Sequence, residues 1–136
     1  NQDISAKDNP HYLQPGARLL LADDNPANLK MIGDFLRLNG FEVFSASSGN
    51  AAIKLAIEHN PQVLLIDVQL TDLDGLEVTR QLRQQPQFRQ TPIIALTALA
   101  MPGDREKCLQ AGMDAYLSKP VGLKELHQTL ATYLPH

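Results

Sequence analysis

Polar residues follow four apolar segments of this sequence, at the points where the apolar runs stop. They are Asp23 with Asp24, then Asp67, Thr97 and Lys119. Each apolar segment is typical of a buried strand in a parallel sheet. If these strands lie side by side, the polar groups meet at one edge of the sheet. Three carboxylates, a hydroxyl and an ammonium are suited to binding a divalent metal ion and a phosphoryl group.

Strand and helix signals alternate from residue 18 to the end of the chain. Apolar runs predict strands at 19–22, 41–46, 63–68, 92–96 and 115–117. Apolar residues at helical spacing predict helices at 26–39, 49–59, 76–83, 102–112 and 123–134. In the second helix, Ala52, Ile53, Ala56 and Ile57 are expected to face inward. Asn25, Ser48 and Asp74 are the expected N-caps of the first three helices.

This regular alternation predicts an α/β fold. Successive strand–helix units imply right-handed crossovers and a doubly wound parallel sheet. Ligands in such sheets bind outside the carboxyl ends of the strands. The polar residues that end the strands are therefore expected at the ligand site.

Composition limits the other functions of the chain. At 136 residues it is one domain, expected over 18–136, with a polar linker or extension over 1–17. The net charge of −3 gives no electrostatic argument for binding nucleic acid. No apolar run approaches the ~20 residues of a membrane span. The single cysteine, Cys108, suits the reducing cytosol. We therefore expect a cytoplasmic domain without membrane contact, or the cytosolic part of a larger sensor protein.

The acids favour Mg²⁺, which takes oxygen ligands and retains several waters. We expect Asp24 and Asp67 to bind the ion directly and Asp23 to act through water. The backbone carbonyl of Gln69 would complete the protein ligands. Asp67 ends the most apolar strand, where a charge has little structural use, so we interpret it as a nucleophile toward phosphorus.

Lys119 is interpreted as the counter-charge and phosphate ligand. Pro120 follows it, and a cis bond is possible there. The Thr97 hydroxyl is positioned to donate to a phosphoryl oxygen, and the small Ala98 would leave access to Asp67. Tyr116 is equally consistent with a packed aromatic and with a functional residue.

The loop 69–75 carries two further acids. Asp72 and Asp74 are interpreted as residues that shape the turn, with Asp74 also capping the next helix. Gly75 is expected to allow that turn.

Together these residues resemble the receiver domain of two-component response regulators. The motifs are Asp23-Asp24, Asp67, Asp74-Gly75, Thr97-Ala98 and Lys119-Pro120. The resemblance implies a flavodoxin-like sheet in the order 2-1-3-4-5 with five helices. It also implies that Asp67 accepts a phosphoryl group from a histidine of a kinase or phosphotransfer protein.

The resemblance assigns further roles. Thr97 and Tyr116 would form a switch that alters the surface of the fourth helix, fifth strand and fifth helix. Gln69 and Leu99 stand where the family tunes acyl-phosphate lifetime. Thr71 stands where the family often has proline. The stretches DDNPANLK and ALTALAMPGDREKCLQAGMDAYLSKPV are similar to receivers of hybrid sensor histidine kinases.

Several alternatives remain open. The first residue is not Met, so we expect a piece excised from a hybrid kinase, although a stand-alone regulator is also possible. A receiver that docks partners without phosphorylation is a second reading. A third reading is a phosphatase of the haloacid dehalogenase type. That class has a second aspartate two residues after the nucleophile, where this chain has Gln69, so we disfavour this reading. The sequence does not indicate the oligomeric state.

Overall fold

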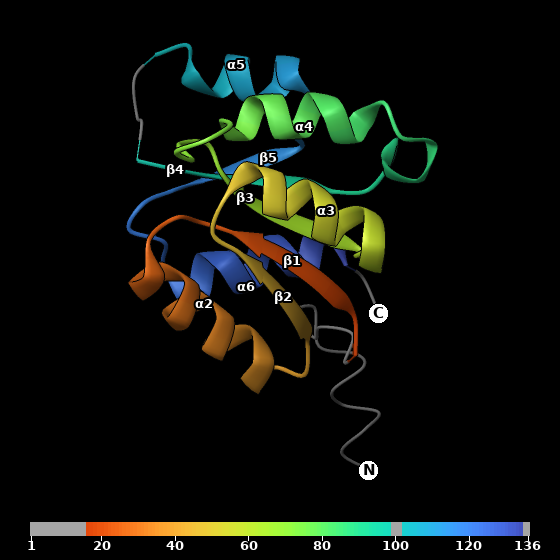
Figure 1. The fold of residues 1–136 in the computed structure, drawn as a ribbon. Coiled ribbons are helices and arrows are strands. Elements are labelled where there is room, and N and C mark those ends of the chain that lie inside the picture. Colours follow the sequence, from red (N-terminus) through yellow and green to blue (C-terminus); the bar gives the residue numbers. More distant parts are fainter. Residues whose placement is uncertain (1–15, 99–101, 135–136) are drawn as a thin grey trace.

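Five parallel strands form the centre of the molecule (Figure 1). The computed structural model describes residues 16–98 and 102–134. The strands are β1 (Arg18–Ala22), β2 (Glu42–Ala46), β3 (Val63–Asp67), β4 (Ile93–Thr97) and β5 (Ala115–Ser118). Their order across the sheet is β2-β1-β3-β4-β5, and every neighbouring pair is parallel. The predicted doubly wound, flavodoxin-like sheet is thus confirmed.

Helices connect the strands in the alternating pattern that the sequence predicts. They are α2 (Pro26–Leu38), α3 (Gly49–His59), α4 (Gly75–Arg83), α5 (Asp104–Ala111) and α6 (Leu123–Tyr133). A short 3₁₀ helix, η1 (Pro86–Phe88), lies between α4 and β4 and was not predicted. None of the helices in the described ranges has both the length and the apolar character needed to span a bilayer.

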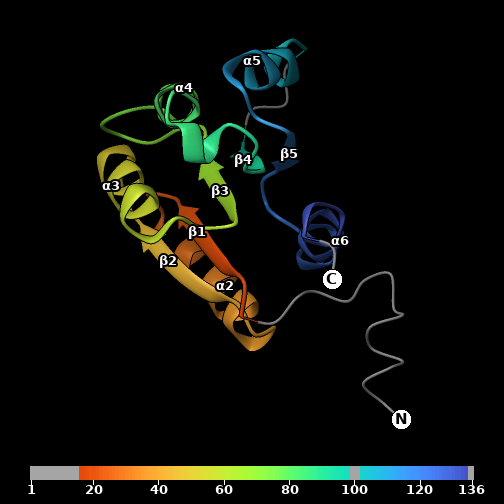
Figure 2. The ribbon, with the colours of Figure 1, turned by 90° about the vertical axis from the view of Figure 1, so that its right-hand side faces the viewer.

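The sheet is covered on both faces, which explains its apolar strands (Figure 2). Side chains alternate between the faces along each strand. Leu19 and Leu21 of β1 pack with buried residues of α2 and α6. Leu20 and Ala22 pack on the opposite face with residues of α3 and α4. A strand buried on both faces has no room for a charge along its length, so charged side chains are confined to its end.

Side-chain caps fix where the first three helices begin. The Asn25 side chain accepts hydrogen bonds from the N–H groups of Ala27 and Asn28. Ser48 and Asp74 each accept one from the third residue that follows them. These bonds satisfy amides that have no partner within the helix. The predicted caps are confirmed, and each defines the start of a helix beside the carboxyl ends of the strands.

Some boundaries and one inward position differ from prediction. Strand β2 begins one residue later than predicted, β3 ends one residue earlier, and α5 begins at Asp104 rather than at 102. The prediction that Ile57 faces inward is wrong, because 44% of it is exposed. Of the predicted linker 1–17, residues 1–15 lie outside the described ranges, and Ala17 is buried in the core with 3% exposed.

Candidate functional site

The ends of four strands meet at one edge of the sheet. Asp23 directly follows β1, and Asp67 is the last residue of β3. Thr97 ends β4, and its carbonyl accepts a hydrogen bond of 2.8 Å from the N–H of Lys119. The Asp23 N–H donates to the carbonyl of Ala46 at 3.0 Å. Because backbone bonds between neighbouring strands hold these residues, their side chains start from fixed positions.

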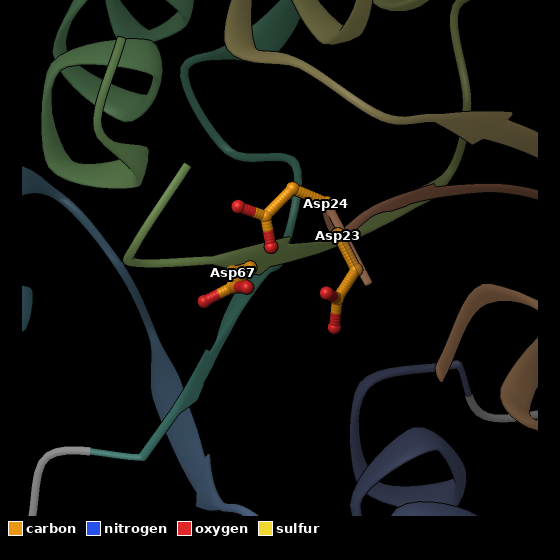
Figure 3. Close-up of side chains that lie close together, drawn as sticks. All are labelled: Asp23, Asp24 and Asp67. Carbon is orange, nitrogen blue, oxygen red and sulfur yellow. The ribbon is translucent and has the colours of Figure 1, made fainter. Parts of the chain in front are cut away.

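Three carboxylates converge at this edge (Figure 3). One oxygen from each of Asp23, Asp24 and Asp67 lies within 4.8 Å of the other two. Asp23 is fully buried and Asp67 is 2% exposed. Like charges so close together repel one another unless a cation compensates them. The arrangement is therefore a candidate binding site for a cation.

Lys119 supplies one compensating charge. Its Nζ lies 2.8 Å from Oδ2 of Asp67 and 3.0 Å from Oδ2 of Asp23, and 18% of its side chain is exposed. The Lys119–Pro120 peptide bond is cis, which agrees with the expectation from the proline at this position. One ammonium against three carboxylates leaves two negative charges when all the acids are ionised.

The environment changes the pKa of both partners in the Lys119–Asp67 pair. Burial raises the pKa of Asp67, and the bonds from Lys119 and from the Gln69 N–H oppose this rise only in part. The negative charge of Asp23 adds to it. Burial alone would lower the pKa of Lys119, but Asp67 and Asp23 more than offset that effect and raise it. Lys119 has two carboxylate partners, whereas Asp67 shares its one cation with a competing acid.

The two adjacent acids after β1 have different surroundings. Asp23 Oδ1 accepts from the N–H of Asn25 at 2.9 Å, and Oδ2 accepts from Nδ2 of Asn28 at 3.3 Å. These bonds fix its carboxylate in the turn before α2. Asp24 makes no side-chain hydrogen bond or ion pair with any other residue in the described ranges. Its oxygens are thus available to a ligand at the site.

The other predicted site residues in the described ranges come from β4, β5 and the segments that follow β3 and β4. Thr97, 1% exposed, and Gln69 line a cavity of about 390 Å³ between the loop after β3 and α5. Ala98 is exposed beside Thr97, and Leu99 lies outside the described residues. Tyr116 is half-buried on the sheet face that α3 and α4 cover. The roles of these residues remain predictions.

Asp72 makes a contact that sequence reasoning missed. It was interpreted as a turn-shaping residue, but its two oxygens accept from the N–H groups of Gly49 and Asn50 at 2.8 and 3.1 Å. It therefore links the loop after β3 to the start of α3. An acid in a loop gives no sequence signal for a partner 23 residues away.

Gly75 lets the helix after this loop pack against the acidic site. Its N–H donates to the carbonyl of Val68 at 2.9 Å. A Cβ at this position would overlap the backbone carbonyl oxygen of Asp67 and lie 2.9 Å from Cα of Val68. The backbone of α4 thus approaches the end of β3 too closely for any other residue.

Gly75→Ala should lower the free energy of unfolding by about 2–3 kcal/mol, because a rigid backbone cannot give way to the added methyl. Urea unfolding followed by circular dichroism measures this. Gly33→Ala is the matched control, since its Cβ would meet only the flexible Arg37 guanidinium, at 3.0 Å. The free energy of unfolding of Gly33→Ala should stay within about 1 kcal/mol of the wild-type value, because alanine is favoured over glycine inside a helix. Equal stability of the two variants would contradict the packing argument.

The fold and site together define a doubly wound α/β domain with a cluster of three carboxylates and a lysine at the carboxyl ends of its strands. The family model of the response regulator receiver domain matches residues 19–131. The chain therefore belongs to the response regulator receiver family of two-component signalling. The predicted family is confirmed.

Relatives of known name agree with this assignment. The polar-differentiation response regulator DivK of Brucella ovis is 40% identical over 116 residues, covering 85% of this chain and 94% of that protein. The receiver domain of sensor histidine kinase PA1611 from Pseudomonas aeruginosa was solved with magnesium in its active-site cleft. It is 43% identical with a TM-score of 0.81, covering 87% of this chain and 97% of that one.

A third relative was solved with a signalling partner. This is the co-crystal structure of the Saccharomyces cerevisiae histidine phosphotransfer protein Ypd1 and the receiver domain of its downstream response regulator Ssk1. The match is 29% identical with a TM-score of 0.80, covering 88% of this chain and 89% of the matched chain.

Proposed function

We propose that this receiver domain accepts a phosphoryl group on Asp67 in a Mg²⁺-dependent reaction. The donor is a phosphohistidine of a histidine kinase or of a phosphotransfer protein. One observation carries the proposal: the nearly buried Asp67 carboxylate lies 2.8 Å from the Lys119 ammonium and beside Asp23 and Asp24. A carboxylate in this setting is poised both to attack phosphorus and to share a metal ion.

The donor set fits Mg²⁺. All the candidate ligands are oxygens, as this hard cation requires, and the Asp24 carboxylate has no competing partner among the described residues. Asp24 and Asp67 would bind the ion directly, Asp23 would act through water, and Gln69 would contribute its backbone carbonyl. When bound, the ion neutralises charge on the incoming phosphoryl oxygens. The PA1611 receiver, with magnesium in its cleft, supports this choice of metal.

The transfer requires little beyond alignment and charge compensation. An oxygen of Asp67 forms a bond to phosphorus as the bond from phosphorus to the donor histidine nitrogen breaks. The imidazole leaves with the electron pair of that bond, and the product is an acyl phosphate. Lys119 already contacts Asp67 and stabilises the added negative charge, while the Thr97 hydroxyl donates to a phosphoryl oxygen.

The phosphorylated domain then acts as a switch. Thr97 and Tyr116 change position, and the surface formed by α5, β5 and α6 changes its partners. Thermodynamically, the phosphoryl group stabilises one of two conformations that already exist. Gln69, Ala98 and Leu99 would set how readily water reaches the acyl phosphate, and with it the rate at which the domain hydrolyses its own phosphoryl group.

The relatives indicate the kind of partner. The Ssk1 receiver, crystallised with Ypd1, supports a histidine phosphotransfer protein as donor or acceptor. The PA1611 receiver belongs to a sensor histidine kinase and supports a parent protein in which receiver and kinase share one chain.

Mass spectrometry of the intact protein tests the proposal. Incubation with acetyl phosphate and Mg²⁺ should add one phosphoryl group to the wild-type chain. A chelator should prevent the reaction, because the carboxylates would then repel the anionic donor. Absence of an adduct on a folded, metal-binding sample would overturn the proposal in favour of a receiver that only docks partners. Equal reaction with chelator would refute the metal requirement.

A further inference from the structure

The loop between β3 and α4, residues 68–74, is attached to a helix from a different part of the fold. The attachment consists of two hydrogen bonds: one carboxylate oxygen of Asp72 accepts from the N–H of Gly49, and the other accepts from the N–H of Asn50. Contact around this link is close: a Cβ at Gly49 would lie 2.6 Å from the carbonyl oxygen of Leu73. The middle of the loop therefore rests directly on the first turn of α3.

The same loop is also bound at the acidic site. The N–H of Gln69 donates to Oδ1 of Asp67 at 2.9 Å. The N–H of Gly75 donates to the carbonyl of Val68 at 2.9 Å and closes the loop. Gln69 itself is exposed, so side-chain packing does little to hold it. Its N–H is held by Asp67, and its carbonyl leads through the buried Leu70 to the attachment at Asp72.

Thr71 increases the importance of that attachment. The sequence resembles receivers that often have proline here, and proline restricts the backbone without any partner. Threonine leaves more conformations available, and Thr71 is exposed. Between the buried Leu70 and the α4 cap, Leu73 packs against the core, and Asp72 is the side chain that hydrogen-bonds the loop to α3.

We propose that Asp72 is a positioning residue for the metal site: by holding the loop 68–74 against α3, it sets the place of the Gln69 carbonyl. This inference rests on the proposed function, in which that carbonyl is a metal ligand. The hydrogen bonds from Gly49 and Asn50 lower the pKa of Asp72, so its carboxylate stays ionised and able to accept both bonds at neutral pH. Groups that orient metal ligands without touching the metal typically change affinity about 10–100-fold when removed.

The helix that Asp72 caps provides a matched control. Ser48 also caps α3, accepting from the N–H of Ala51 at 3.1 Å, but it belongs to the connection before α3 rather than to the loop. Asp72→Ala and Ser48→Ala each remove capping bonds from the same helix end. Only the first frees the loop. Any loss of metal affinity that follows merely from a weakened α3 should appear in both variants.

Titration calorimetry with Mg²⁺ alone tests the proposal. We expect Asp72→Ala to weaken Mg²⁺ binding about tenfold and Ser48→Ala to change it less than twofold. Asp72→Asn keeps one accepting oxygen and should fall between Asp72→Ala and wild type. Urea unfolding confirms that each variant is folded. Equal Mg²⁺ affinity of Asp72→Ala and Ser48→Ala would overturn the positioning role.

Amide hydrogen exchange in the metal-free protein separates this inference from the proposed function. The Gln69 amide should exchange faster in Asp72→Ala than in Ser48→Ala, because the loop opens locally. Unchanged exchange would refute the attachment even if the wild type binds Mg²⁺ and accepts phosphate. A wild-type protein that neither binds Mg²⁺ nor accepts phosphate would refute the proposed function, and with it the metal-positioning role.

Discussion

Asp67→Asn should take up no phosphoryl group and should be more stable than the wild type when no metal is present. The amide cannot form the acyl phosphate, so the adduct from acetyl phosphate should disappear completely. The gain in stability has a separate cause. Because burial and the neighbouring Asp23 raise the pKa of Asp67, its ionised form is less favourable in the folded protein than in the unfolded chain.

The sign of this effect determines its pH dependence. A carboxyl whose pKa is raised on folding binds its proton more tightly in the folded state. The resulting penalty is absent below the ordinary pKa of 3.8 and develops as pH rises through the raised value. The stability advantage of Asp67→Asn should therefore be largest at neutral pH and shrink as pH falls toward 4.

Intact mass measures the loss of the phosphoryl adduct, and urea unfolding at several pH values measures the gain in stability. Asp34→Asn is the control, because this carboxylate is on α2 with 52% of its side chain exposed. It should keep the adduct and show little change in stability. An adduct retained at full level in Asp67→Asn would mean that another residue is the acceptor. A metal-free variant less stable than wild type at pH 7 would contradict the direction of the pKa shift.

Lys119→Met should lower the stability of the metal-free protein by about 3 kcal/mol and slow phosphoryl uptake about 100-fold. Removing the ammonium leaves two buried carboxylates, Asp23 and Asp67, without their shared cation. It also removes the donor that would stabilise charge on the phosphoryl group. Mg²⁺ should bind the variant more tightly than the wild type, since the site has become more negative.

The metal response distinguishes this expectation from a simple loss of packing. At the same saturating Mg²⁺ concentration, Lys119→Met should gain more stability than the wild type, because the stabilisation by a ligand grows with the logarithm of its affinity. Lys107→Met is the control for phosphoryl uptake, since Lys107 lines the neighbouring cavity but forms no ion pair with Asp67. Its uptake should match the wild type. A Lys119→Met protein with unchanged Mg²⁺ affinity would contradict the electrostatic argument.

The architecture could be predicted because local patterns and global fold agree. Strands apolar on both faces, such as Val63–Asp67, require helices on both sides, and the order of elements then leaves few topologies. Caps such as Asn25 and Ser48 were readable because their partners lie within three residues. The exposure of Ile57 could not be predicted in the same way. Helical spacing shows which side of α3 is apolar but not how much of that side the sheet covers.

The residues of the acidic site were determined by the sequence alone. Asp23, Asp24, Asp67 and Lys119 each stand at the end of a strand, and parallel strands bring those ends to one edge. Residue type and position along the chain were therefore enough to select them. Their family, a response regulator receiver, followed from the same order and spacing.

Only the tertiary structure decided how these groups share their charges and which residues support them. Lys119 pairs with both Asp23 and Asp67, Asp24 is left for another ligand, and Asp72 attaches its loop to α3. These contacts join residues that are tens of positions apart in the sequence. A linear pattern records which residue types are present, whereas Coulombic and hydrogen-bond energies depend on distance and solvent exposure.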